Sequence, residues 1–320
     1  MRLSRRAALA LLAGPALARA QPPWPAHPIR IVIAWPAGGS TDGLLRAIQA
    51  PLQAVLGQTV VLENRAGASG SIGAAVVAQA APDGYTLLSD ASTQAVNPAL
   101  LRGLAFDYAT AFVPITLVAQ APLLLAVRAD SPAQDVPGLL ALLHGQPGGG
   151  TYSSSGIGTA AHLAAAMLLR QAGVAATHVP YRGSPPQVQA VLAGEVVFTC
   201  ATVPALAGLV QDGRLRALAA TSGHRLAGFP AVPTVAEQGF AGFAITEWLA
   251  MLAPAGTPAP ILEQVAAAVA AALRDPAVQR RLPGLGMEPA GEGPAALAAF
   301  LAEQRVRMAA LIQAENIRLE

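Results

Sequence analysis

The stretch that decides the fold of this chain is Ile29-Arg30-Ile31-Val32-Ile33-Ala34-Trp35, followed by Pro36-Ala37-Gly38-Gly39-Ser40-Thr41-Asp42. The segment Ile31 to Trp35 is apolar and rich in branched side chains, which predicts a strand buried on both faces. Apolar residues then recur at helical spacing as far as Leu56, which predicts a helix that packs back on this strand. A strand, a glycine-rich turn and a helix therefore open the folded part of the chain.

The turn has the composition of an anion site. Gly38 and Gly39 allow backbone angles that are closed to other residues, and they let a ligand approach the main chain. Ser40, Thr41 and Asp42 belong to the residue types that cap helix N-termini. Free N–H groups and the positive end of a helix dipole suit a small anion such as a carboxylate. The alternative is that Asp42 only caps the helix.

The composition is that of a compact globular protein. Of the 320 residues, 53% are hydrophobic and 12% are charged, so the chain can bury one large core or two medium ones. All 20 basic residues are arginines, scattered along the sequence, and the formal net charge is only +2, so we expect no nucleic-acid partner. The single cysteine, Cys200, excludes an internal disulfide and lies in an apolar run, where a buried, inert thiol is expected.

The N-terminus is a targeting segment. Arg2, Arg5 and Arg6 form a basic region, residues 7–17 are apolar, and Ala18-Arg19-Ala20 is a cleavage pattern. Residues 1–20 are therefore predicted to be a signal peptide, with Sec export favoured over the twin-arginine route, which the paired arginines also permit. No other stretch has the length and apolar character of a membrane span. We expect an exported, periplasmic protein with no membrane span of its own.

The first half of the chain reads as βαβαβ. Strands are expected at 31–35, 59–63 and 85–89, with helices between them. This order predicts a parallel sheet with ligands at the carboxyl ends of its strands. The segment 90–97 leaves the third strand at that end, which makes Ser92 a candidate ligand contact.

A second unit of the same kind follows. Residues 112–127 contain two apolar runs broken by Gln120-Ala121-Pro122, which predicts a crossing between lobes, and residues 247–252 read as the return crossing. Between them lies a second polar turn, Ser154-Ser155-Gly156-Ile157-Gly158-Thr159, placed between a strand and a helix. Tyr181 opens a further loop after the next strand. Two such turns facing each other across a cleft would grip both ends of a small dianion.

These units predict an α/β, two-lobed periplasmic-binding-protein fold of the type II kind, in which each lobe is a mainly parallel sheet flanked by helices. The first lobe is expected to hold residues 21–121 and 243–320, and the second lobe residues 122–242, with the ligand cleft between them.

Catalytic and cofactor patterns are weak. Gly156-x-Gly158-x-x-Ala161 imitates a dinucleotide fingerprint, but no acid follows at the required distance. A P-loop needs a lysine, and the chain has none. No serine has the glycines of a nucleophile elbow, and the five histidines are dispersed. We therefore expect no enzyme activity, no cofactor and no metal site.

Several motifs, in order, carry a family resemblance. They are Pro28-Ile29-Arg30-Ile31-Val32-Ile33, the turn 36–42, Val61-Leu62-Glu63-Asn64-Arg65, Ala81-Pro82-Asp83-Gly84-Tyr85-Thr86-Leu87, Asn97-Pro98-Ala99-Leu100, Val179-Pro180-Tyr181-Arg182-Gly183, Gly213-Arg214-Leu215-Arg216-Ala217-Leu218 and Val232-Pro233-Thr234-Val235-Ala236-Glu237. Together they resemble the substrate-binding proteins of tripartite tricarboxylate transporters, the Bug or TctC family, over essentially the whole mature chain.

The resemblance implies a periplasmic, monomeric solute-binding protein that closes like a Venus flytrap on a small organic carboxylate and feeds two membrane components of a transporter. It implies that the two turns hold the carboxylate largely through main-chain amides, hydroxyls and water. The residues that match are Ala37, Gly38, Gly39, Asp42, Ser154, Ser155, Gly156, Gly158 and Thr159; Ser40, Ser92 and Tyr181 are candidates beside them.

Some residues depart from the family pattern. Ala34, Ala66 and Ser69 replace residues common in the family, which affects the expected selectivity more than the class. Trp35 stands where the family often has phenylalanine, and it either stacks on a planar ligand or packs in the core against the first helix. Two other functions stay open: a periplasmic sensor that presents its ligand to a receptor, and, less favoured, an enzyme with a cryptic site.

Overall fold

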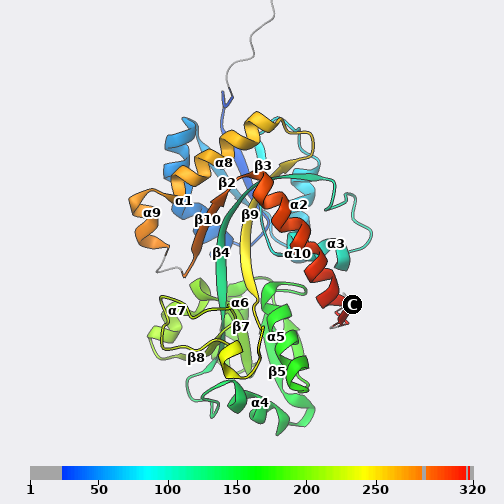
Figure 1. Ribbon diagram of the computed structural model, residues 1–320, viewed down its shortest axis with the longest axis vertical. Coiled ribbons are helices and arrows are strands. Elements are labelled where there is room, and N and C mark those ends of the chain that lie inside the picture. The colour runs from blue at the N-terminus through cyan, green and yellow to red at the C-terminus, as the bar shows by residue number, and fades with distance from the viewer. Residues whose placement is uncertain (1–23, 283–285, 315, 318–320) are drawn as a thin grey trace, which may run out of the picture.

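The computed structural model describes residues 24–282, 286–314, 316 and 317, and the expected signal peptide lies outside them. Figure 1 shows two lobes, one above the other, joined by two long strands. The strands are β1 (Ile29–Ile33), β2 (Val60–Asn64), β3 (Thr86–Ala91), β4 (Phe112–Arg128), β5 (Thr151–Ser154), β6 (Thr177–Pro180), β7 (Phe198–Thr202), β8 (Leu215–Ala220), β9 (Thr246–Pro254) and β10 (Glu288–Glu292). The helices are α1 (Ser40–Leu56), α2 (Ser71–Ala78), α3 (Thr93–Leu100), α4 (Val136–His144), α5 (Ala160–Ala172), α6 (Ser184–Ala193), α7 (Val203–Gln211), α8 (Ala259–Leu273), α9 (Pro276–Arg281) and α10 (Pro294–Ala314), with short 3-10 turns η1 (Ala68–Gly70), η2 (Pro147–Gly149) and η3 (Ala236–Gln238).

The first lobe is built on the parallel strands β2, β1 and β3, in that spatial order. Side chains of β1 alternate between two cores because successive residues of a strand point to opposite faces. Ile31 and Ile33 pack with α1 and α8 on one face, whereas Val32 packs with α2 and α3 on the other. The buried, branched character of this strand therefore follows from helices on both sides of the sheet, as the sequence predicts.

The crossing strands join the lobes. β9 pairs with β4 over Phe112 to Pro122, and from Leu123 onward β4 changes partners to β7 and β8. Both crossing strands run antiparallel to their neighbours, so the complete sheet is mixed. The parallel strands predicted from the sequence form the outer parts, β2-β1-β3 and β6-β5-β7.

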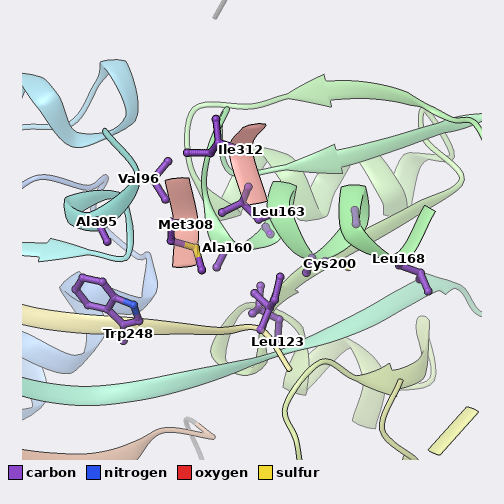
Figure 2. Packing of buried hydrophobic residues seen from close by; sticks show 14 of the residues in the cluster. Ala95, Val96, Leu123, Ala160, Leu163, Leu168, Cys200, Trp248, Met308 and Ile312 are labelled. Atoms are coloured by element: carbon purple, nitrogen blue, oxygen red, sulfur yellow. The ribbon is translucent and has the colours of Figure 1, made fainter. Parts of the chain in front are cut away.

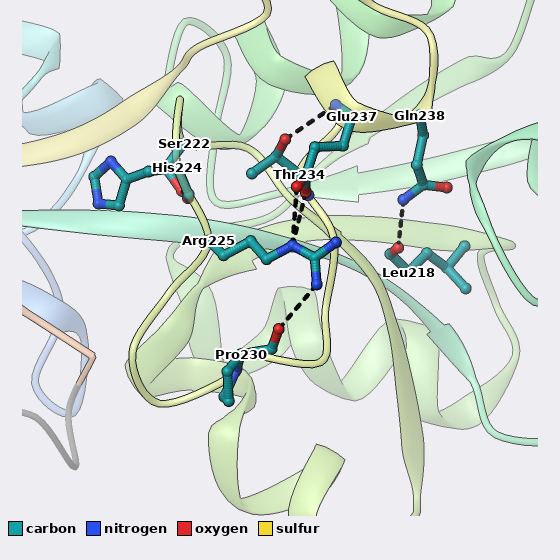
Figure 3. A network of polar contacts seen from close by, with 8 residues as sticks. All are labelled: Leu218, Ser222, His224, Arg225, Pro230, Thr234, Glu237 and Gln238. Carbon is teal, nitrogen blue, oxygen red and sulfur yellow. Dashed lines mark hydrogen bonds and ion pairs between the residues drawn. The ribbon is translucent and has the colours of Figure 1, made fainter.

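The second lobe includes a long connection between β8 and β9. Figure 3 shows how polar contacts hold it: Arg225 pairs with Glu237 and also donates to the carbonyl of Pro230. Thr234 and Glu237 exchange hydrogen bonds, which lowers the pKa of Glu237. Gln238 donates to the Leu218 carbonyl of β8. The connection is therefore an ordered part of the lobe.

Helix α10 belongs to the first lobe and also contacts the second lobe. Figure 2 shows Met308 and Ile312 of this helix beside Ala160 and Leu163 of α5, all within one buried cluster. The same cluster includes Trp248 of β9. The C-terminal helix of the first lobe therefore packs on the second lobe. Within the described ranges, no helix combines the length and apolar character that a membrane span requires.

Candidate functional site

An inner cavity lies between the lobes, and the space inside it that is open to water-sized molecules is about 30 Å³. The first lobe contributes the turn before α1 and the end of β3, the crossing strands contribute the floor, and the second lobe contributes the starts of α6 and α7. The lining residues are Trp35, Pro36, Gly39, Ser40, Thr41, Ala91, Leu123, Ser155, Ala161, Gly183, Ser184, Gln187, Ala201, Thr202, Glu247 and Leu249.

The N-terminus of α1 opens into this cavity without a cap. Its N-cap residue is Gly39, which has no side chain to accept a hydrogen bond, and the N–H groups of Ser40, Thr41 and Asp42 find no acceptor among the described residues. Such orphan donors need a partner from outside the helix. Together with the helix dipole they form a site for a negatively charged oxygen.

Two helices of the second lobe also begin at the cavity. Gly183 and Ser184 lead into α6, Thr202 leads into α7, and neither helix has a side-chain cap. Prolines in both first turns remove some N–H donors, so these helices add their dipoles and the hydroxyls of Ser184 and Thr202 more than main-chain hydrogen bonds. Positive helix ends therefore approach the cavity from both lobes.

The second predicted turn, 154–159, is arranged differently from the expectation. Thr159 caps α5 with its own side chain, and the Gly158 N–H donates to His162 Nδ1 at 3.1 Å. Ser154 Oγ lies 2.6 Å from His178 Nε2, and burial lowers the pKa of His162 to about 3 and of His178 to about 4, so both rings are neutral. Ser154, Gly158 and Thr159 therefore bond within their own lobe and do not line the inner cavity.

Loop 181–184 takes the place across from the first turn. Gly183 packs so closely that a Cβ on it would lie 2.8 Å from Pro36 Cγ, and its φ of +99° also favours glycine. The second turn faces the 66–72 segment instead, where Ser69 Oγ donates to the Ile157 carbonyl at 2.9 Å. Of the second turn, only Ser155 lines the inner cavity.

Asp42 braces the first turn from outside the cavity. Its Oδ2 accepts from the Gly38 N–H at 3.0 Å and from Arg46 Nε at 2.9 Å, and its Oδ1 accepts from Asn64 at 3.1 Å. Although burial opposes ionisation, these hydrogen bonds lower the pKa of Asp42. Asp42 and Gly38 therefore satisfy each other, and Ala37 and Gly38 are exposed outside the cavity.

An outer cavity, with about 540 Å³ open to water-sized molecules, adjoins the inner one and shares Trp35, Pro36, Ser155 and Gly183 with it. Gly156, Tyr181 and Arg182 line this outer space. Arg182 is exposed, and no described residue forms an ion pair or hydrogen bond with its side chain. The outer cavity therefore presents a positive charge at the approach to the inner one.

Trp35 is half-buried at the boundary of the two cavities. Its ring packs against the buried core residues, and its Nε1 donates to Asp90 Oδ1 at 3.0 Å. It therefore combines both alternatives that the sequence allows: it packs against the core and exposes part of its ring to the cavities.

Two buried acids lie behind Trp35. Asp90 accepts hydrogen bonds from the Ala91 N–H, Trp35 and Thr93, and burial raises its pKa to about 7. Glu247 lines the inner cavity, and its Oε1 accepts from the Ser92 N–H at 2.8 Å and the Trp248 N–H at 3.1 Å. Burial also raises the pKa of Glu247.

Ser92 does not line the inner cavity. Its N–H anchors Glu247, and its side chain lines a separate cavity with Thr246, Trp248 and Arg307. Burial raises the pKa of Glu247, and the Ser92 hydroxyl and N–H oppose that rise. Ser92 therefore positions Glu247 from behind the strand instead of facing the same space.

Comparisons with known proteins identify the family of this chain. The family model described as tripartite tricarboxylate transporter family receptor, TctC, matches residues 44–317. The chain belongs to the TctC family.

Among the relatives of this TctC chain is protein BugT of Bordetella pertussis, which is 34% identical over 299 residues, 93% of this chain and 92% of BugT. The solved structure of the periplasmic binding protein BugD superposes with a TM-score of 0.87 at 32% identity, covering 93% of this chain and 100% of BugD. R. palustris Rpa4515, solved with adipate, superposes with a TM-score of 0.88 at 32% identity, covering 92% and 99% of the two chains.

Sequence reasoning missed several cavity residues of this TctC chain. Gln187, Thr202 and Glu247 come from helix and strand positions in the second half, where nothing local marks them as polar contacts. The prolines at 185, 186 and 204 were a usable signal, because proline is favoured in the first turn of a helix and so marks the starts of α6 and α7.

Across the part of the chain that the structure describes, no three His, Cys, Asp or Glu side chains gather in a way that would hold a metal ion. Cys200 is buried, which raises the pKa of its thiol to about 12. A thiol with that pKa is a poor nucleophile at neutral pH.

Proposed function

We propose that this protein is a periplasmic solute-binding protein that captures a small organic carboxylate in the inner cavity and delivers it to the membrane components of a tripartite tricarboxylate-type transporter. The observation that carries the proposal is the convergence of uncapped helix N-termini on one cavity, α1 from the first lobe and α6 and α7 from the second. Such an arrangement binds an anion without a basic side chain.

The ligand carboxylate is placed at the start of α1, where the N–H groups of Ser40, Thr41 and Asp42 and the hydroxyls of Ser40 and Thr41 are available. Trp35, Gly39, Ser155, Thr202 and Gln187 complete the wall. Gly156, Tyr181 and Arg182 contact the ligand on its way in through the outer cavity. Ala37, Gly38, Asp42, Ser154, Gly158 and Thr159 shape the turns, and Ser92 positions Glu247.

Binding is coupled to closure of the two lobes, 21–121 with 243–320 and 122–242. Ser40 Oγ lies 2.6 Å from Thr202 Oγ1, so the walls of the inner cavity already touch across the cleft. A ligand that bonds both walls stabilises the closed arrangement by its higher affinity for that state. The adipate of Rpa4515 supports the chemical class, because it is a small dicarboxylate bound by a protein of similar fold.

A thermal-shift series on protein that has been unfolded and refolded, to remove ligand carried through purification, tests the proposal. At 100 times the dissociation constant, a ligand adds about 2.7 kcal/mol to the stability of the folded state. We expect a rise in Tm with a subset of small carboxylates and none with the matched neutral alcohols, for example with adipate against 1,6-hexanediol. No rise across mono-, di- and tricarboxylates would contradict the proposal.

Delivery to a transporter is tested separately in cells. Loss of this protein should abolish uptake of the labelled carboxylate that raises the Tm, and uptake should return when the gene is restored. Unchanged uptake would leave the binding function standing and would contradict the transport role.

A further inference from the structure

Glu247 places a carboxyl group on the floor of the inner cavity. It is the one ionisable side chain among the described residues that line this cavity, and it is about nine-tenths buried. A carboxyl group is an unexpected lining for a site that receives a carboxylate, because two like charges in a buried space repel each other. An ionised Glu247 therefore fits a part of the ligand other than its carboxylate.

The backbone fixes the direction of this side chain. Along β9, Glu247 and Leu249 line the inner cavity, whereas Thr246 and Trp248 line the cavity on the opposite face. Two main-chain N–H groups, from Ser92 and Trp248, hold Oε1. Neither of these N–H groups bonds Oε2. Glu247 is therefore anchored by one oxygen and has acceptor capacity left on the other.

No basic side chain neutralises this acid. Lysine is absent from the sequence, and neither an arginine nor a histidine of the described residues lines the inner cavity. The other nearby ionisable group is Asp90, whose own charge opposes that of Glu247. A buried charge without a partner is costly. A positively charged group on the ligand would supply the partner that the cavity lacks.

The cavity is thus polarised, with the positive end of α1 at one wall and the carboxyl of Glu247 at the floor. We propose that Glu247 is a specificity residue that selects a zwitterionic carboxylate, one whose carboxylate lies at the start of α1 and whose ammonium group donates to Glu247. This inference rests on the proposed function and names the ligand class of the same site. Complementary charge at both ends would favour such a ligand over the same acid without an amine.

Matched pairs of acids test this directly by isothermal titration calorimetry on the refolded protein: succinate with aspartate, glutarate with glutamate, and pentanoate with 2-aminopentanoate. In at least one pair the amino acid should bind ten-fold or more tightly than its partner. In Glu247→Gln this preference should fall ten-fold or reverse, since the glutamine carbonyl still accepts from Ser92 and Trp248 while its amide group now donates into the cavity. Glu263→Gln, on the exposed face of α8, removes the same charge and should keep the preference.

The outcomes separate the two proposals. If simple acids bind as well as or better than their amino partners, Glu247 does not select an ammonium group, and the carboxylate-binding function stands alone. If malate binds as tightly as aspartate, a hydroxyl suffices and the zwitterion assignment is overturned. If none of the acids tested here or in the thermal-shift series binds, both proposals fail. Circular dichroism of Glu247→Gln shows whether that variant is folded, and an unfolded variant leaves the wild-type ratios as the deciding measurement.

Discussion

At the scale of single residues, Asp42 stabilises the first turn by joining the Gly38 N–H, Asn64 and Arg46. We expect Asp42→Ala to lower the free energy of unfolding by about 1–3 kcal/mol, because it removes the three hydrogen bonds that the buried Asp42 carboxylate accepts. Carboxylate affinity should fall with it, since the turn that carries the α1 donors loses its brace. Urea unfolding and calorimetry measure the two effects.

The matched control is Arg46→Gln. Arg46 is the exposed partner of the same pair, and an exposed ion pair contributes less than about 1 kcal/mol. If Arg46→Gln and Asp42→Ala destabilise the protein equally, the buried hydrogen bonds of Asp42 are not what orders the turn.

Asp90 should make stability depend on pH. Its pKa rises from 3.8 to about 7 on folding, so the folded state holds a proton more tightly than the unfolded state. Stability from this group is complete below pH 3.8 and is lost as the pH rises toward 7, at about 1.4 kcal/mol per unit of pKa difference. Asp90→Asn should therefore flatten the decline in stability between pH 4 and pH 7.

Urea midpoints at several pH values across that range measure the decline. Asp212→Asn is the control, because Asp212 is exposed and should leave the profile unchanged. If the urea midpoints of Asp90→Asn change with pH as those of the wild type do, Asp90 does not cause the pH dependence of stability.

At the scale of elements, the N-terminus of α1 supplies the carboxylate donors. Proline is well tolerated at the first helical position, and Gly39 before it already has the extended backbone, φ −79° and ψ 174°, that a following proline requires. Ser40→Pro should therefore fold normally but lose one N–H donor. Because a hydrogen bond to a charged group contributes about 1.5–3 kcal/mol, affinity should fall at least ten-fold.

Ser40→Ala separates the main-chain donor from the side chain, because it removes the hydroxyl and keeps the N–H group. Ser40→Pro should bind clearly more weakly than Ser40→Ala in the same titration. Equal affinities would show that the N–H of residue 40 does not contact the ligand.

Some secondary-structure elements could be predicted from the sequence and others could not. Strand β1 was predictable because burial on both faces gives a continuous apolar run. Helix α1 was predictable because burial on one face gives apolar residues at helical spacing. Helix α3 was not predicted, since it is short, begins with polar residues and contains Pro98. Helix α7 was not predicted, because it follows β7 without a loop and extends its apolar run. Strand β10, Glu288–Glu292, has no alternating apolar pattern.

The site was predictable on one wall only. The glycine-rich turn before α1 has a local composition that indicates an anion site. Of this turn, Pro36, Gly39, Ser40 and Thr41 line the inner cavity, whereas Ala37, Gly38 and Asp42 do not. The opposite wall depends on which loops the lobes bring together, and that is fixed by packing such as Gly183 on Pro36. No local pattern distinguishes loop 181–184 from turn 154–159, so the second turn was chosen for its glycines although its donors are used within its own lobe.

At the scale of the whole molecule, three sets of contacts are among those that hold the lobes together in the described arrangement. Ser40 bonds Thr202 at the inner cavity, Ser69 bonds the Ile157 carbonyl at the outer cavity, and α10 packs on α5 behind the crossing strands. The first two sets close the cleft directly. The third lies on the far side of β4 and β9, where opening of the lobes has to slide Met308 and Ile312 over α5.

The two cleft hydrogen bonds should set the balance between open and closed forms. Each contributes about 1 kcal/mol, so Ser69→Ala combined with Thr202→Val should shift this balance about 30-fold toward the open form. The radius of gyration of the ligand-free protein, from small-angle X-ray scattering, should increase. Ligand affinity should fall by up to the same factor, because only the closed form bonds the ligand from both walls. Saturating ligand should restore the compact radius, since binding shifts the population back to the closed form.

The control is Ser131→Ala, which loses a hydrogen bond inside the second lobe only and should change neither radius nor affinity. A double variant that binds more weakly but keeps the wild-type radius would mean that these hydroxyls contact the ligand without controlling closure.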